Sequence, residues 1–225
     1  FIAVAAFWAT SLVEKKVNGE LNPMYKPATL YYALTAIAVI IGISAFALPD
    51  RKVNLLSKAN NDNYVNSYEI KLMTTDELAF RIMDEDKAIQ IFDLRLKKDF
   101  DSLSLPGSMN YTLESIFEKD ANNLLSLKNK KNVFIADDEQ MARRGAFLAS
   151  YLGFTDIYIL QGGLERFKKD IIFFKNPGTA NTQREKDTYR FRTEASNIIP
   201  ELIQKNKEKQ KSSGENKPKR VVGGC

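Results

Sequence analysis

Residues 132–153 read NVFIADDEQMARRGAFLASYLG and contain a strand, a loop and a helix in succession. The short apolar run 132–135 is typical of a buried parallel strand. Apolar residues recur at helical spacing over 142–152, and Gly153 ends that pattern. Residues 136–141 lie between the two as a loop. The stretch therefore predicts one strand–loop–helix unit of an α/β domain.

The same alternation extends outward over residues 68–175, which we expect to be the folded domain. The further expected strands and helices are a strand over 68–73, a helix capped by Thr74 or Thr75, strands over 88–92 and 157–160, and a helix over 164–171. This order predicts a mostly parallel sheet flanked by helices. Ligands of such sheets bind at the carboxyl ends of the strands, so the loop after residue 135 is the candidate site.

Four short motifs occur in the order found in rhodanese (sulfurtransferase) domains, which the sequence resembles. They are Asp93-Leu94-Arg95, Leu105-Pro106-Gly107-Ser108-Met109-Asn110, Val133-Phe134-Ile135-Ala136 and Gln161-Gly162-Gly163-Leu164. The resemblance implies a rhodanese-like fold and aligns Ala136 with the cysteine that accepts sulfur in active members. It also implies an Arg-Ser or Arg-Thr pair closing the loop, where this sequence has Met141-Ala142. We therefore expect a domain that is not an enzyme.

The expected loop has the appearance of a vestigial active site. Its residues are Ala136, Asp137, Asp138, Glu139, Gln140 and Met141. Three carboxylates at a helix start interact favourably with the helix dipole, and they occupy the electropositive spot that thiosulfate or phosphate would need. We interpret them as a solvated acidic cap, with a site for a cation or a basic partner as the alternative.

Two further pairs match the motifs and are assigned structural roles. Asp93 and Arg95 are expected to hold the loops over the strand ends through charge-assisted hydrogen bonds. Gly162 and Gly163 are expected to allow a tight turn before the last helix of the domain.

Histidine is absent, and the single cysteine, Cys225, is the last residue. This composition excludes an intrachain disulfide, a Cys/His metal cluster and a histidine general base within the sequence. We accordingly predict neither a metal site nor a cofactor.

Residues 28–48 are 21 uncharged residues bracketed by Pro27 and Pro49. As a helix they would extend about 31 Å, enough to cross a bilayer core, and we predict a transmembrane helix; a buried helix of a soluble protein is the alternative. Residues 1–13 are apolar but too few to span, and we interpret them as the end of a truncated transmembrane helix. On this interpretation we expect the chain to be a fragment of a larger membrane protein, with a helical hairpin at its start.

Polar stretches flank the expected domain. Residues 49–67 are predicted to be a linker, because Asn60-Asn61-Asp62-Asn63 favours turns. Residues 176–220 are predicted to be a helical and basic linker, with a helix over 188–204 interrupted at Pro200. The run 203–220 carries a net charge of +5, equal to that of the whole chain. Because it has no interleaved aromatic residues, we expect no nucleic-acid partner, and a polybasic segment near a membrane is the alternative to a solvated linker.

Residues 221–225, the last five of the chain, are interpreted as the possible start of a further segment. Together with Arg220 they resemble the Gly-Gly-Cys segment of YeeE/YedE-type sulfur-transport membrane proteins. This resemblance implies that Cys225 is a possible thiol site.

Two functions stay open on the sequence. The first is a membrane-tethered, inactive rhodanese-like module with a docking or regulatory role in sulfur-compound handling. The second is part of a thiosulfate or sulfur transporter that uses Cys225. The expected partners are the membrane and other transmembrane segments, of the same protein or of a transporter. Lys217, Lys219 and Arg220 favour a cytoplasmic domain.

Overall fold

The computed structural model describes residues 14, 28–47 and 50–215, with side chains described over 32–44 and 50–208 in the two longer ranges. The chain divides into two units, residues 1–50 and 51–225. The expected segments 1–13 and 221–225, and with them Cys225, lie outside the described residues.

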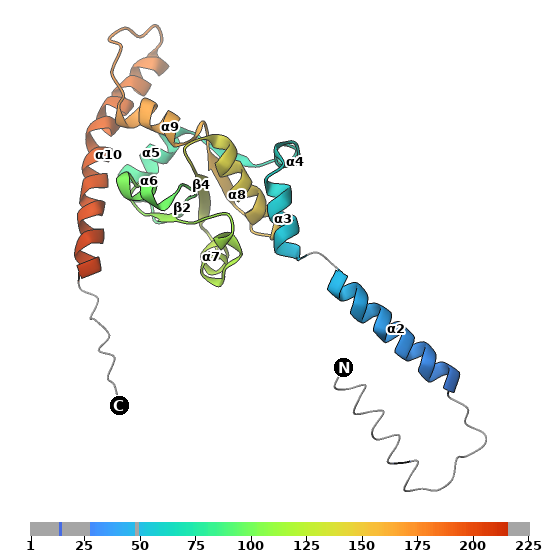
Figure 1. Cartoon of the computed structure of the whole chain (residues 1–225). Coiled ribbons are helices and arrows are strands. Elements are labelled where there is room, and N and C mark those ends of the chain that lie inside the picture. The colour runs from blue at the N-terminus through green and yellow to red at the C-terminus, as the bar shows by residue number, and fades with distance from the viewer. Residues whose placement is uncertain (1–13, 15–27, 48–49, 216–225) are drawn as a thin grey trace, which may run out of the picture. The chain divides into compact units, whose positions relative to one another are not determined.

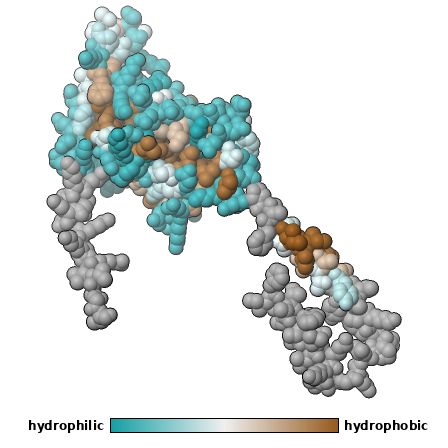
Figure 2. All heavy atoms as spheres, in the orientation of Figure 1, coloured by the Kyte–Doolittle hydropathy of each residue, from teal (hydrophilic) through white to brown (hydrophobic). Residues whose placement is uncertain are grey.

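The described part of the first unit contains helix α2 (Ala28–Ala47), whose bounds agree with the predicted helix to within one residue. Its side chains at Ile40, Ile41 and Ile43 are more than 60% exposed, and Figure 2 colours much of this helix as hydrophobic. In the part of the chain that the structure describes, no helix is both long and apolar enough to cross a membrane. A membrane crossing by residues 28–48 thus stays a prediction from the sequence.

The second unit is built on a five-stranded sheet in which all the neighbouring strands are parallel. The strands are β1 (Lys71–Met73), β2 (Ile89–Asp93), β3 (Ser108–Asn110), β4 (Lys131–Ile135) and β5 (Ile157–Leu160). They lie in the order β1-β5-β4-β2-β3. The predicted α/β class with a parallel sheet is therefore confirmed. The first strand is shorter than the expected 68–73, and β3 was not expected.

Helices cover both faces of this sheet (Figure 1). They are α3 (Arg51–Ala59), α4 (Asp62–Asn66), α5 (Thr75–Met83), α6 (Lys97–Ser102), η1 (Ser115–Phe117), α7 (Lys119–Leu125), α8 (Glu139–Tyr151), α9 (Gly163–Phe167), η2 (Lys168–Ile172) and α10 (Gln183–Glu215). Thr74 caps α5 as predicted, because its hydroxyl accepts a hydrogen bond from the amide of Glu77 at 3.1 Å.

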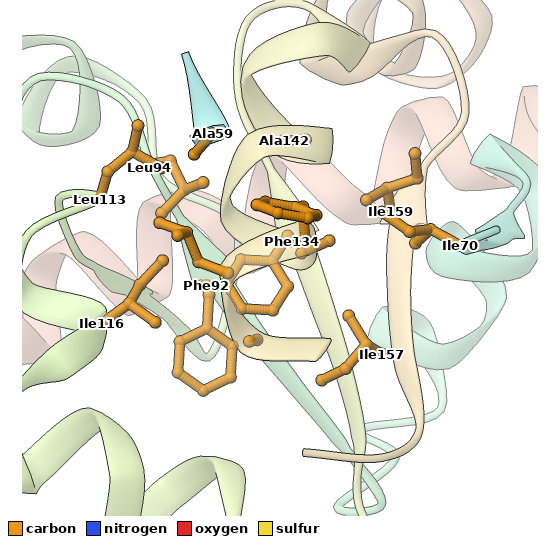
Figure 3. Packing of buried hydrophobic residues seen from close by; sticks show 14 of the residues in the cluster. Ala59, Ile70, Phe92, Leu94, Leu113, Ile116, Phe134, Ala142, Ile157 and Ile159 are labelled. Atoms are coloured by element: carbon orange, nitrogen blue, oxygen red, sulfur yellow. The ribbon is translucent and has the colours of Figure 1, made fainter. Parts of the chain in front are cut away.

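Each central strand contributes to two cores because its side chains alternate between faces. Phe134 faces the core beneath α8, where its ring stacks on that of Phe92 with 5.1 Å between centroids (Figure 3). Val133 and Ile135 face the opposite core, beneath α5, α9 and α10. Burial on both faces explains why residues 133–135 of β4 are all apolar, without polar alternation.

The predicted linker over 49–67 was wrong for residues 51–66. These form the two helices α3 and α4, and Leu55, Ala59 and Val65 are buried in the core beneath α8. Leu55 and Ala59 are four residues apart, so they lie on one face of α3. Asn61 does form a turn, but it serves as the N-cap of α4, with its side chain accepting from the amide of Tyr64.

The helix predicted within 176–220 is confirmed as α10, but the linker role is wrong for residues 183–203, because this part of α10 packs on the domain. Ala195 and Ile199 are fully buried in the second core, and Arg192 forms a bidentate ion pair with Asp76 of α5 at 2.8 and 2.9 Å. The helix continues through Pro200, where an interruption was expected. Apolar contacts on both sides of the proline offset the loss of one helical hydrogen bond.

Candidate functional site

The candidate site lies where β2 and β4, two neighbouring central strands, reach their carboxyl ends. Ala136 directly follows β4 and is only 1% exposed. The helix α8 begins at Glu139, earlier than the predicted Ala142, so Gln140 and Met141 belong to its first turn. The connection from strand to helix is thus shorter than the predicted six-residue loop.

Each of the three acidic side chains has a partner within the domain. Asp138 is the N-cap of α8, and its carboxylate accepts from the amide of Met141 at 2.8 Å. Glu139 accepts from the amide of Gly162 at 2.8 Å and from the Arg143 guanidinium at 3.1 Å. Two of these carboxylates therefore fix the start of α8, in addition to any interaction with its dipole.

The third carboxylate, Asp137, is half-exposed and lies 3.8 Å from a guanidinium nitrogen of Arg95. Arg95 is itself almost fully buried, so this contact joins the end of β4 to the segment that follows β2. The predicted acidic cap is thus partly a set of internal contacts. Among the described residues, no three acidic, cysteine or histidine side chains are placed to hold a metal ion together.

Asp93 and Arg95 form a buried, multiply bonded ion pair. The guanidinium donates to both Asp93 carboxylate oxygens, with a shortest distance of 2.7 Å, and also to the carbonyl oxygen of Leu103 at 2.6 Å. The Asn110 amide donates to the backbone carbonyls of both Asp93 and Arg95. This arrangement connects the ends of β2 and β3 to the segment after α6, as a positioning role requires.

Gly162 and Gly163 form a turn with φ of +74° and +66° that packs against the end of β4. The amide of Leu164 donates to the carbonyl oxygen of Ala136 at 2.8 Å. A Cβ at residue 163 would lie 2.5 Å from the carbonyl oxygen of Asp137, which is closer than real Cβ contacts. Glycine is therefore required at 163 both for its backbone conformation and for this close approach.

Sequence reasoning missed Asp62, which lies beside the site in space. One of its carboxylate oxygens accepts from the Gln140 amide at 3.0 Å and from the Arg144 guanidinium at 2.9 Å. The hydrogen bond from Arg144, and then that from Gln140, lowers the pKa of Asp62 below the ordinary value for an aspartate. No local pattern links residue 62 to residues 140 and 144, so the sequence carries no signal for this contact.

Residues 74–170 match the family model of the rhodanese-like domain. A search of curated proteins found no match to the chain.

Similar solved structures include a rhodanese-related protein of Thermoplasma volcanium, with 21% identity over 43% of this chain and 89% of that one, and a TM-score of 0.36. A single-domain sulfurtransferase of Saccharomyces cerevisiae has 17% identity over 44% and 89%, with a TM-score of 0.37. The rhodanese-like domain of an Anabaena protein has 20% identity over 51% and 89%, with a TM-score of 0.39.

Proposed function

Because residues 74–170 form a rhodanese-like domain, we propose that this domain is a non-catalytic docking or regulatory module in sulfur-compound handling. The observation that carries the proposal is the methyl side chain of Ala136 at the buried end of β4, where the resemblance places the sulfur-accepting cysteine. A methyl group has neither a lone pair nor an ionisable proton, so it cannot form a persulfide.

The surroundings of Ala136 support the same proposal. A reactive thiol needs an electropositive environment that stabilises its thiolate. Here the next three residues are carboxylates, two of which are hydrogen-bonded to backbone amides. They would raise the pKa of a thiol at residue 136 and repel anionic sulfur donors such as thiosulfate.

The test is a thiosulfate:cyanide sulfurtransferase assay, in a Cys225→Ser background so that no other thiol contributes. We expect no thiocyanate formation by the chain with Ala136, and little by Ala136→Cys. Turnover by the chain with Ala136 would overturn the non-catalytic assignment. Turnover by Ala136→Cys at the rate of an active sulfurtransferase would refute the argument that the neighbouring carboxylates suppress a thiol at residue 136. It would not affect the argument that the chain with Ala136 lacks a sulfur acceptor there.

We further propose that residues 28–48 tether the domain to a membrane, with the domain on the cytoplasmic side. The support is the uncharged sequence of 28–48, the helix formed by Ala28–Ala47 and the basic residues near the end of the chain. The full chain should stay in the pellet after carbonate washing and ultracentrifugation, and a chain beginning at residue 51 should not. Recovery of the full chain in the supernatant would refute the tether.

A further inference from the structure

The hairpin of α3 and α4 contacts the first two turns of α8 through one exposed carboxylate. Asp62, the first residue of α4, accepts hydrogen bonds from Gln140 and Arg144, which follow it by 78 and 82 residues. Gln140 lies in the first turn of α8, directly after Glu139. Asp62 is therefore connected to the same helical turn whose backbone Asp138 caps.

Apolar contacts hold the hairpin in place around this carboxylate. Val65 is fully buried, and the rings of Tyr64 and Tyr68 meet the ring of Phe147 on α8 edge-on, with centroids 5.7 and 5.4 Å apart. The ammonium of Lys58 lies 5.4 Å from the ring centroid of Tyr64. Because this packing is anchored on α8 itself, α4 presents Asp62 to the start of α8 in a defined position.

We propose that the α3–α4 hairpin acts as a clamp, by which we mean that it holds the start of α8 in place. Asp62 couples the position of the hairpin to the conformation of the site at the end of β4. The chain enters the domain through α3, and the clamp precedes the matched family region 74–170. A change imposed on α3 or α4 alters the contacts of Gln140 and Arg144, and through them the order of residues 137–141. The clamp acts on the conformation of the loop, so it operates whether or not the domain is catalytic.

The apolar contacts of the hairpin are stronger than the polar contacts of Asp62, so the polar contacts can open while the hairpin stays on the domain. Three apolar residues of the hairpin are buried, and they keep α3 and α4 on the domain. The Asp62 carboxylate is 54% exposed, so its ion pair with Arg144 is screened by water and opens readily. The expected motion is a local release of the start of α8 while the hairpin stays docked.

Amide hydrogen exchange on the full chain tests the clamp, with Asp62→Ala and Arg144→Met as separate variants. Each is expected to speed exchange at residues 138–145 by about two- to five-fold, the range that an exposed ion pair contributes. The double variant should show no more than Asp62→Ala alone, because Asp62→Ala already removes the hydrogen bonds from both Gln140 and Arg144.

Asp101→Ala is the matched control. Its carboxylate is 55% exposed and pairs with Lys97 within α6, away from α8. This variant should leave exchange at 138–145 unchanged. Unchanged exchange in Asp62→Ala, additive effects in the double variant, or an equal effect of Asp101→Ala would each overturn the clamp. None of these results bears on the sulfurtransferase assay, so the two proposals fail independently.

Discussion

Replacing Gly163 by alanine should destabilise the domain far more than the same change at Gly153. Both glycines have positive φ, +66° and +96°. An added Cβ at 153 meets nothing within 4 Å, whereas one at 163 lies 2.5 Å from the carbonyl oxygen of Asp137 and 2.8 Å from the Cα of Asp138. Because these neighbours are backbone atoms, they cannot move aside by a change of rotamer.

The expected free energies follow from these two contributions. Alanine in the left-handed region costs about 1–2 kcal/mol, and this term applies to both variants. Overpacking against the fixed backbone at 163 adds about 1–3 kcal/mol. We therefore expect a loss of about 1–2 kcal/mol for Gly153→Ala and about 2–5 kcal/mol for Gly163→Ala.

Urea unfolding followed by far-ultraviolet circular dichroism measures the difference as a shift of midpoint at constant slope. Comparing the two variants removes the cost of positive φ that they share. The remaining difference in the free energy of unfolding therefore reports the contact between the turn and the end of β4. Losses of stability that agree to within about 0.5 kcal/mol, less than the smallest overpacking cost, would refute the close approach.

Three further predictions concern the contacts around the site. A chain beginning at residue 67 should be less stable than one beginning at residue 51 by about 3–6 kcal/mol, since the two large apolar side chains that the α3–α4 hairpin buries, Leu55 and Val65, contribute about 1.5–3 kcal/mol each; equal urea midpoints would contradict this. Arg95→Met leaves Asp93 buried and unpaired and should cost about 3–5 kcal/mol in the same measurement, whereas a loss under about 1 kcal/mol would show that the pair is dispensable. The pKa of Asp62 is lowered in the folded chain, so the contribution of its carboxylate to stability is complete above the ordinary aspartate pKa and is lost as pH falls through the lowered value. A carboxyl-carbon NMR titration of Asp62 with a midpoint at or above the ordinary value would disprove this lowering.

Local patterns were sufficient to place the strands β2, β4 and β5, and with them the candidate site after β4. The runs that became β2, β4 and β5 were located to within one residue, because burial on both faces of a sheet makes most residues of such a strand apolar. The cap at Thr74 and the end of α8 before Gly153 depend on the chemistry of a few adjacent residues. The short β3 and α6 were missed because neither is long enough to show a period.

The two segments wrongly predicted to be linkers are those whose buried residues pack against elements far along the chain. Leu55 and Ala59 form a helical stripe that is too short to outweigh the asparagine-rich turn after it, and their burial depends on α8, far along the chain. The helix predicted over 188–204 was assigned to a linker because of the basic run that follows it, although its apolar stripe includes Ala195 and Ile199, which are buried. Overall polarity measures the exposed face of such a helix and hides its buried face.

The sequence by itself determined the parallel α/β class, the position of the candidate site after β4 and the alanine at that position. These features depend on residue identity and on spacing within a few positions along the chain. Only the tertiary structure decided that Glu139 accepts from Gly162, that Asp62 accepts from Gln140 and Arg144, and that α10 completes the second core. Each of these contacts joins elements that lie far apart along the chain, and it exists because the packing of helices on the sheet brings their side chains together.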